Sequence, residues 1–91
     1  MAIALNDQLS IPEEVVSRKL GDDTVLLNLT TGTYYGLDAV GTRLWELLGE
    51  KAELGAAHRA MLEEYDVTSE TLEADLVRIC EEMLARGLLV H

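Results

Sequence analysis

Residues 15–37 form short runs that are rich in Val, Leu, Thr and Tyr, and residues 24–29 place apolar side chains on both faces of a strand. Runs of this kind, separated by turn signals, predict a small antiparallel meander of three strands. The turns are expected at residues 21–23 and 30–32, with Gly32 as the residue at positive φ. The expected strands are residues 15–20, 24–29 and 33–37.

From residue 38 onward the apolar positions recur at helical spacing. A first helix is expected from the N-cap Asp38 to Gly49, and a second from about residue 53 to 65. Thr68 is a suitable N-cap for a third helix that ends near Arg86. Three strands followed by three helices predict an α+β fold in which a three-stranded antiparallel sheet and three helices form a winged-helix-like arrangement.

The third expected helix has more apolar positions than docking against one sheet requires. They are Leu72, Leu76, Val77, Ile79, Cys80, Met83 and Leu84. Either this helix is packed on two sides, or part of its apolar face is left for a ligand. The sequence alone leaves both alternatives open.

The composition restricts the classes of partner. A length of 91 residues suits one domain, residues 1–91. The 17 Asp and Glu against 7 Lys and Arg give a formal charge of −10, which repels nucleic-acid phosphates and anionic lipid. No run approaches the length of a membrane span. With a single cysteine and no leading signal segment, a cytoplasmic protein is expected.

The residues that could carry catalysis do not form a recognisable set. His58 is expected on the exposed side of the second helix, and Cys80 is expected to be buried as a small hydrophobe. Glu81 and Glu82 are expected on a solvated helix face. No metal-ligand spacing or phosphate-binding loop is present. The chain is therefore expected to be no enzyme and to need no cofactor.

The third expected strand has an unprotected edge. It contains no Lys, no Pro and no inward-pointing charge, which are the residues that usually protect an edge strand. An edge of this kind can accept an added strand from another chain through main-chain hydrogen bonds. Of Tyr34 and Tyr35, one is expected to cap the core instead.

The stretch LLNLTTGTYYGLDAVGTRLWELL, residues 26–48, resembles the PqqD-like family, the leader-recognition elements of ribosomally made, modified peptides. The later segments EYDV, TLEADLVRIC and RGLLV extend the resemblance over residues 9–90. Because the strand TGTYYGL leads directly into a Trp-containing helix, the sequence looks most like the stand-alone leader-binding proteins of lasso-peptide pathways.

The resemblance implies a function by binding alone. It implies that the leader of a precursor peptide adds as a strand beside the third strand and is handed to a leader peptidase and a cyclase. It also implies a monomer or weak dimer that binds neither nucleic acid nor membrane. The implied peptide-binding residues are Thr33, Tyr34, Tyr35, Gly36, Leu37, Leu72, Asp75, Leu76, Ile79 and Met83.

Some roles stay open at this point. Asp75 either orients a group of the leader or serves the helix dipole, and Arg78 either pairs with Asp75 or meets an acidic leader residue. Tyr34→Ala and Met83→Asp are expected to weaken leader binding without unfolding the domain.

Two other functions remain as alternatives. One is a PqqD-type peptide chaperone for a radical-SAM or other peptide-modifying enzyme, and the other is a winged-helix DNA-binding regulator. The third helix argues against DNA binding, because it offers Arg78 and Arg86 among five carboxylates: Glu70, Glu73, Asp75, Glu81 and Glu82.

Overall fold

Three strands precede three helices in the computed structural model, which describes residues 3–91. Met1 and Ala2, which the expected domain includes, lie outside the described residues. The predicted α+β order is confirmed, and the element boundaries lie within about two residues of those expected. The elements are β1 (Val15–Leu20), β2 (Asp23–Asn28), β3 (Tyr34–Leu37), α1 (Ala39–Glu50), α2 (Leu54–Glu64) and α3 (Ser69–Ala85).

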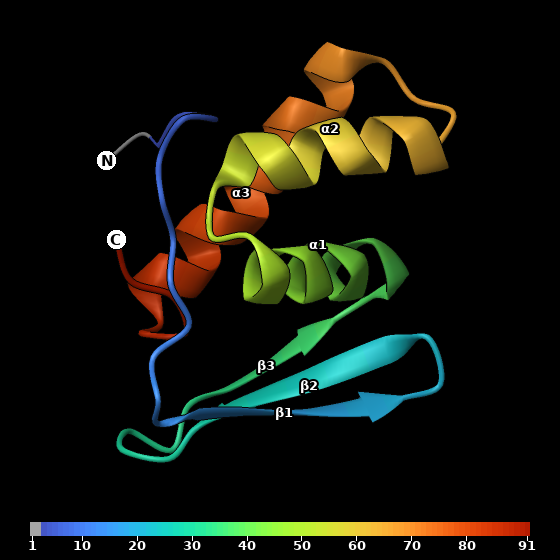
Figure 1. The fold of residues 1–91 in the computed structure, drawn as a ribbon. Coiled ribbons are helices and arrows are strands. Elements are labelled where there is room, and N and C mark those ends of the chain that lie inside the picture. Colours follow the sequence, from blue (N-terminus) through green and yellow to red (C-terminus); the bar gives the residue numbers. More distant parts are fainter. Residues whose placement is uncertain (1–2) are drawn as a thin grey trace.

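The strands form one antiparallel sheet in the order β1-β2-β3. Gly21, at φ +65°, and Gly32, at φ +76°, occupy the two turns, where a residue with a side chain would be strained. All three helices lie on the same side of the sheet (Figure 1). The opposite face of the sheet is therefore left without a covering layer among the described residues.

The core lies between the sheet and the helices. α1 packs on β2 and β3, while α2 and α3 pack on α1 and on each other. The largest fully buried side chains come from both ends of the chain as well as from the helices. They are Leu9, Leu26, Leu44, Leu54, Met61, Leu76, Cys80, Met83, Leu88 and Leu89.

The end of α1 differs from the sequence expectation. Gly49 lies inside the helix, and the helix ends at Glu50, where the N–H of Lys51 donates to the Leu47 carbonyl at 2.8 Å. Gly49 does not have the positive φ of a helix-terminating glycine, whereas Gly87, after α3, does, with φ +72°.

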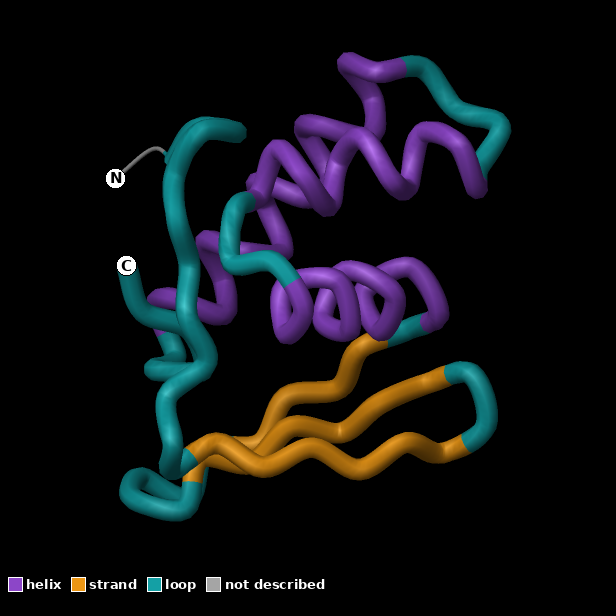
Figure 2. Tube along the Cα trace, in the orientation of Figure 1, coloured by secondary structure: helices purple, strands orange, loops and turns teal. Residues whose placement is uncertain are grey.

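The backbone of the segment before β1 caps the N-terminus of α2. Figure 2 shows this N-terminal loop segment, in teal, running from the helices down to the strands. The carbonyl of Asp7 accepts from the N–H of Leu54 at 3.2 Å, and the carbonyl of Leu5 accepts from Gly55 at 2.6 Å. A Cβ at position 55 would lie 2.9 Å from the Leu5 oxygen, so only glycine fits there. These carbonyls replace the side-chain cap that Glu53 does not provide.

Asn28 joins the sheet to the C-terminal end of α3. Its side chain is 2 % exposed, and its Nδ2 donates to the carbonyl of Gly87 at 2.9 Å. Its Oδ1 accepts from the N–H groups of Thr30 and Thr31, at 2.9 and 3.0 Å. One buried amide thus holds the β2–β3 turn and fixes where α3 ends relative to β3.

We predict that Asn28→Ala lowers the free energy of unfolding by about 2–3 kcal/mol, because a buried side chain loses three partly buried hydrogen bonds together. Urea unfolding followed by circular dichroism measures the change. Asn6→Ala, at an exposed position, is the matched control and should stay within about 0.5 kcal/mol of the wild type. Equal stability of the two variants would contradict a structural role for Asn28.

Candidate functional site

The outer edge of β3 carries unpaired backbone groups. The N–H of Asn28 donates to the Thr33 carbonyl at 2.9 Å. Together with the register, this bond establishes which residues of β3 hydrogen-bond to β2. Because paired and unpaired residues alternate along an antiparallel strand, Tyr35 and Leu37 direct their N–H and C=O groups toward β2. Those of Tyr34 and Gly36 point away from β2, to an edge where no further strand pairs within residues 3–91.

The other edge of the sheet is protected. β1 contains Arg18 and Lys19, and the Lys19 Nζ lies 3.3 Å from the Glu46 Oε2 on α1. Charged side chains on an edge strand oppose pairing with a second chain. β3 is therefore the edge of the sheet that lacks this protection.

A pocket of about 190 Å³ lies between β3 and α3. Arg78 and Ile79 come from α3, and the other lining residues come from β3 and the start of α1: Tyr35, Gly36, Leu37, Asp38 and Gly41. The Oδ1 of Asp38 accepts from the N–H of Gly41 at 2.9 Å, which caps α1. A Cβ on Gly41 would lie 3.0 Å from the Leu37 Cδ2, so glycine lets β3 and α1 meet closely beside the pocket.

Three side chains bridge β3 and α3 at one end of this pocket. The Tyr35 hydroxyl donates to the Glu82 carboxylate, and the Arg86 guanidinium lies 4.9 Å from the centre of the Tyr35 ring. Burial, together with the hydrogen bond to Glu82, raises the pKa of the Tyr35 phenol. Tyr35 therefore stays protonated at neutral pH and holds the helix at a fixed distance from the strand.

Comparison with known proteins decides the family. The model of the family described as coenzyme PQQ synthesis protein D (PqqD) matches residues 23–89, which include β2, β3 and all three helices. This chain belongs to the PqqD family. The PqqD-like resemblance read from the sequence is confirmed.

This chain is also similar to a protein whose structure has been solved. The PqqD-family chain matches a protein solved as TbiB1 in complex with the TbiA(β) leader peptide, at 42 % sequence identity and a TM-score of 0.83. The match covers 88 % of this chain and 93 % of that one. A comparison with curated proteins gives no match.

Six of the residues predicted for peptide binding lie at the edge or the pocket. Tyr35, Gly36, Leu37 and Ile79 line the pocket, and Thr33 is half-buried just before β3. Tyr34 is 67 % exposed on the opposite face of the sheet, whereas Tyr35 packs against the core. The expectation that one of the two tyrosines caps the core is therefore confirmed.

Three other predicted residues are in the core of this PqqD-family fold. Leu72 is 4 % exposed, and Leu76 and Met83 are fully buried, so none of them presents a contact surface to a peptide. Met83→Asp would bury a carboxylate among apolar side chains, so the structure predicts that this variant unfolds, contrary to the sequence expectation. Most of the apolar face of α3 packs against α1, α2 and the rest of the core, and Ile79 is the member of it that lines the pocket beside β3.

Asp75 and Arg78 do not form a pair. Asp75 is exposed on α3, and the ion pair of Arg78 among the described residues is with Glu82, at 3.8 Å. The Glu82 side chain is 44 % exposed, as expected of a solvated face, but it also forms the bridge to Tyr35, which the sequence interpretation did not include. Its position one helical turn from both Arg78 and Arg86 was the signal available in the sequence.

The expectation that His58 lies on the exposed side of the second helix is also wrong. His58 is 4 % exposed, and its Nε2 lies 3.0 Å from the carbonyl oxygen of Ser69, so it joins α2 to the start of α3.

No group of three or more His, Cys, Asp or Glu residues suited to a metal ion is present within residues 3–91. None of the helices described here is long and apolar enough to cross a membrane.

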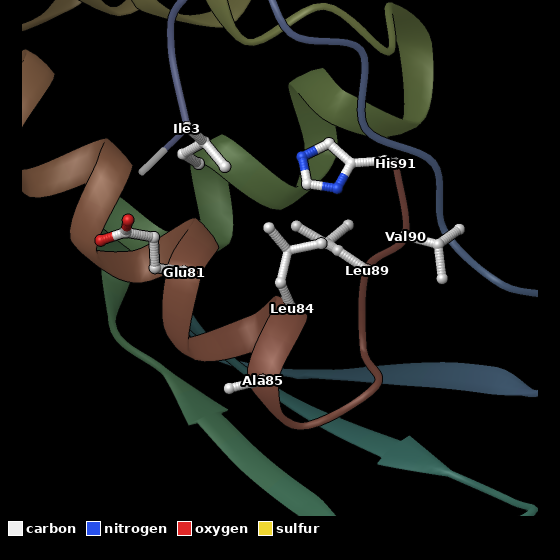
Figure 3. A pocket seen from close by; sticks show the side chains of 7 residues that line it. All are labelled: Ile3, Glu81, Leu84, Ala85, Leu89, Val90 and His91. Atoms are coloured by element: carbon white, nitrogen blue, oxygen red, sulfur yellow. The ribbon is translucent and has the colours of Figure 1, made fainter. Parts of the chain in front are cut away.

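A larger pocket, of about 640 Å³, lies on another face of α3 (Figure 3). Its lining is mainly apolar and comes from α3 and both chain ends: Ile3, Glu81, Leu84, Ala85, Leu89, Val90 and His91. Volume alone favours this pocket, but β3 does not contribute to it. The smaller pocket beside β3 is the better candidate for peptide binding, because it adjoins the unpaired backbone groups.

The thiol of Cys80 is predicted to be unreactive in the folded protein. The side chain is fully buried, and burial raises its pKa to about 12. Ellman's reagent at pH 8 should therefore react with less than a tenth of the thiol in the native state and with all of it in urea. Complete reaction without denaturant would contradict the buried position.

Proposed function

We propose that this PqqD-family chain binds the leader segment of a ribosomally synthesised precursor peptide as a fourth strand of the sheet. The unpaired N–H and C=O groups of Tyr34 and Gly36, beside the pocket at Ile79, are the observation that carries the proposal. The 42 % identity to a protein solved with a leader peptide supports it.

The geometry gives each part of the peptide a role. The backbone of the peptide pairs with Tyr34 and Gly36, which supplies affinity independent of sequence. Its alternate side chains point toward α3, where Arg78 and Ile79 line the pocket. Tyr35 and Leu37 line this side of the site, Thr33 precedes it on the strand, and Asp75 is exposed on α3 and is expected to contact the leader as well.

The bound leader is then presented to the leader peptidase and the cyclase of a lasso-peptide pathway, which we expect to operate in the cytoplasm. The chain itself acts by binding alone. In support, its single thiol is buried, and His58 is engaged with the Ser69 carbonyl. Neither group is available to a substrate.

The positions of the arginine side chains do not favour DNA binding. Arg43 is paired with Glu46 and Glu64, which lie 3.3 and 2.7 Å away, and Arg78 is paired with Glu82. A recognition helix needs several free cations to meet phosphates. The exposed surface of α3 does not offer them.

The proposal predicts that the loss of affinity caused by blocking a backbone N–H of the peptide alternates from one residue to the next. Synthetic leader peptides carrying one N-methyl group each are titrated by calorimetry. Methylation of an amide that faces β3 should weaken binding at least ten-fold, since the hydrogen bond is lost and the methyl group clashes with the edge. Methylation of the next amide, which faces solvent, should leave the dissociation constant within about two-fold.

The unmethylated leader is the reference, and a shuffled leader of the same composition is the control for specificity. A uniform loss over all positions, or none, would contradict strand addition. Absence of binding by the unmethylated leader would contradict leader recognition itself.

A further inference from the structure

The pocket beside β3 has a mainly polar lining, unlike the larger pocket on the other face of α3. Its charged lining residues are Arg78, from α3, and Asp38, at the point where β3 leads into α1 (Figure 1). An apolar side chain that filled this pocket would remove charged groups from water without giving them a partner. The pocket therefore suits a polar or charged side chain of the peptide.

The carboxylates beside the pocket already have partners. The Asp38 Oδ1 accepts from the N–H of Gly41 at 2.9 Å, at the N-terminus of α1, where the helix dipole also favours a negative charge. The Glu82 carboxylate accepts from the Tyr35 hydroxyl, and the Arg86 guanidinium lies over the ring of that tyrosine. Neither carboxylate is left over to bind a cationic side chain.

Arg78 is differently placed, because its guanidinium keeps donors for a ligand. Its side chain is 62 % exposed, and its Nη1 lies 3.8 Å from the Glu82 Oε2, which is too far for a hydrogen bond. The same oxygen accepts from the Tyr35 hydroxyl. Arg43, by contrast, donates to both oxygens of Glu64, at 2.8 and 2.7 Å. Arg78 can thus bind a second carboxylate through two parallel N–H groups while Glu82 keeps its bond to Tyr35.

Backbone pairing alone does not fix the register of an added strand. β3 has four residues, of which Tyr34 and Gly36 direct their backbone groups to the free edge. A peptide that slips by two residues along this edge makes the same hydrogen bonds and keeps the same set of side chains facing α3. A side-chain contact on α3 is needed to distinguish these positions.

We infer that the pocket takes an Asp or Glu side chain of the leader, whose carboxylate pairs with the Arg78 guanidinium and sets the register of the added strand. The inference rests on the proposed function and adds to it the class of side chain that is recognised. The formal charge of the chain is −10, so carboxylates elsewhere on the leader are repelled. The pair with Arg78 therefore distinguishes one acidic position from the others.

The test titrates the synthetic leader by calorimetry, with each Asp or Glu replaced singly by Asn or Gln. One replacement should weaken binding to the wild type about ten-fold, because a charge-assisted pair is lost. Arg78→Gln should weaken binding of the unmodified leader by the same factor. Against this variant the critical replacement should weaken binding by less than about two-fold further, since two side chains in contact are not additive.

Arg59→Gln is the matched control. Arg59 lies on α2, is 71 % exposed and is paired with Glu53 at 3.4 Å, so this variant removes a similar surface ion pair at a position outside β3 and α3. It should bind every peptide as the wild type does. Arg78→Lys keeps the charge but not the two parallel N–H groups, and it should lose less affinity than Arg78→Gln.

The register is read from the peptides with single N-methyl groups. Exchanging the critical acidic residue with the residue two positions along the leader should move the methylation-sensitive amides by two positions in the wild-type complex. In the complex with Arg78→Gln, the sensitive amides should stay where they were. A scan that does not move in the wild type would contradict the role of Arg78 in setting the register.

Other outcomes overturn the inference while strand addition stands. One is unchanged leader affinity in Arg78→Gln, and another is tight binding of a leader from which every Asp and Glu has been removed. A third is a loss of affinity on neutralising a Lys or Arg of the leader that Asp38→Asn reproduces, because the pocket would then take a cation. A wild-type protein that binds no leader would instead refute the proposed function, and the inference with it.

Discussion

The hydrogen bond from the Asn28 side chain to the carbonyl of Gly87 fixes how the sheet meets α3, and the peptide edge depends on it. At this end, strand and helix are tied by a buried amide. Further along, Tyr35 joins them through its hydroxyl, which donates to the Glu82 carboxylate, and through its ring, which lies under the Arg86 guanidinium. Helix and strand are thus held close without β3 being covered. A site for strand addition needs this combination, because an edge that packed directly on a helix would have no room for a peptide.

The two edges of the sheet differ in how well they are protected against pairing with a fourth strand. Arg18 and Lys19 make β1 unfavourable as a partner, and Lys19 is also engaged with Glu46. β3 is short, carries Gly36 in its centre and is followed at once by the capped start of α1 at Asp38. Its free backbone groups are therefore few but well positioned, and the side chains around them, rather than the number of hydrogen bonds, must supply selectivity for the peptide.

Local signals predicted the fold well and the site in part. Gly21 and Gly32 mark both turns, and Thr68 caps α3, because each needs only its immediate neighbours. The free edge of β3 followed from residues in one strand. What the sequence did not show depends on segments far apart in the chain. The carbonyl of Leu5 caps the start of α2 and His58 lies within hydrogen-bond distance of the Ser69 carbonyl. The Glu82 carboxylate accepts a hydrogen bond from the Tyr35 hydroxyl. The family resemblance implied that Leu76 and Met83 contact the peptide, and helical periodicity could not correct this, because it reports that a face is apolar but not what covers it.

Amide hydrogen exchange at β3, followed by NMR with and without the leader peptide, tests strand addition most directly. Tyr35 and Leu37, whose N–H groups face β2, should exchange slowly in both states. Tyr34 and Gly36 should exchange fast in the free protein and at least ten-fold more slowly in the complex, since only a paired strand protects alternate amides on the outer edge. Unchanged exchange at Tyr34 and Gly36 in a saturated complex would show that the peptide binds elsewhere and would contradict the account.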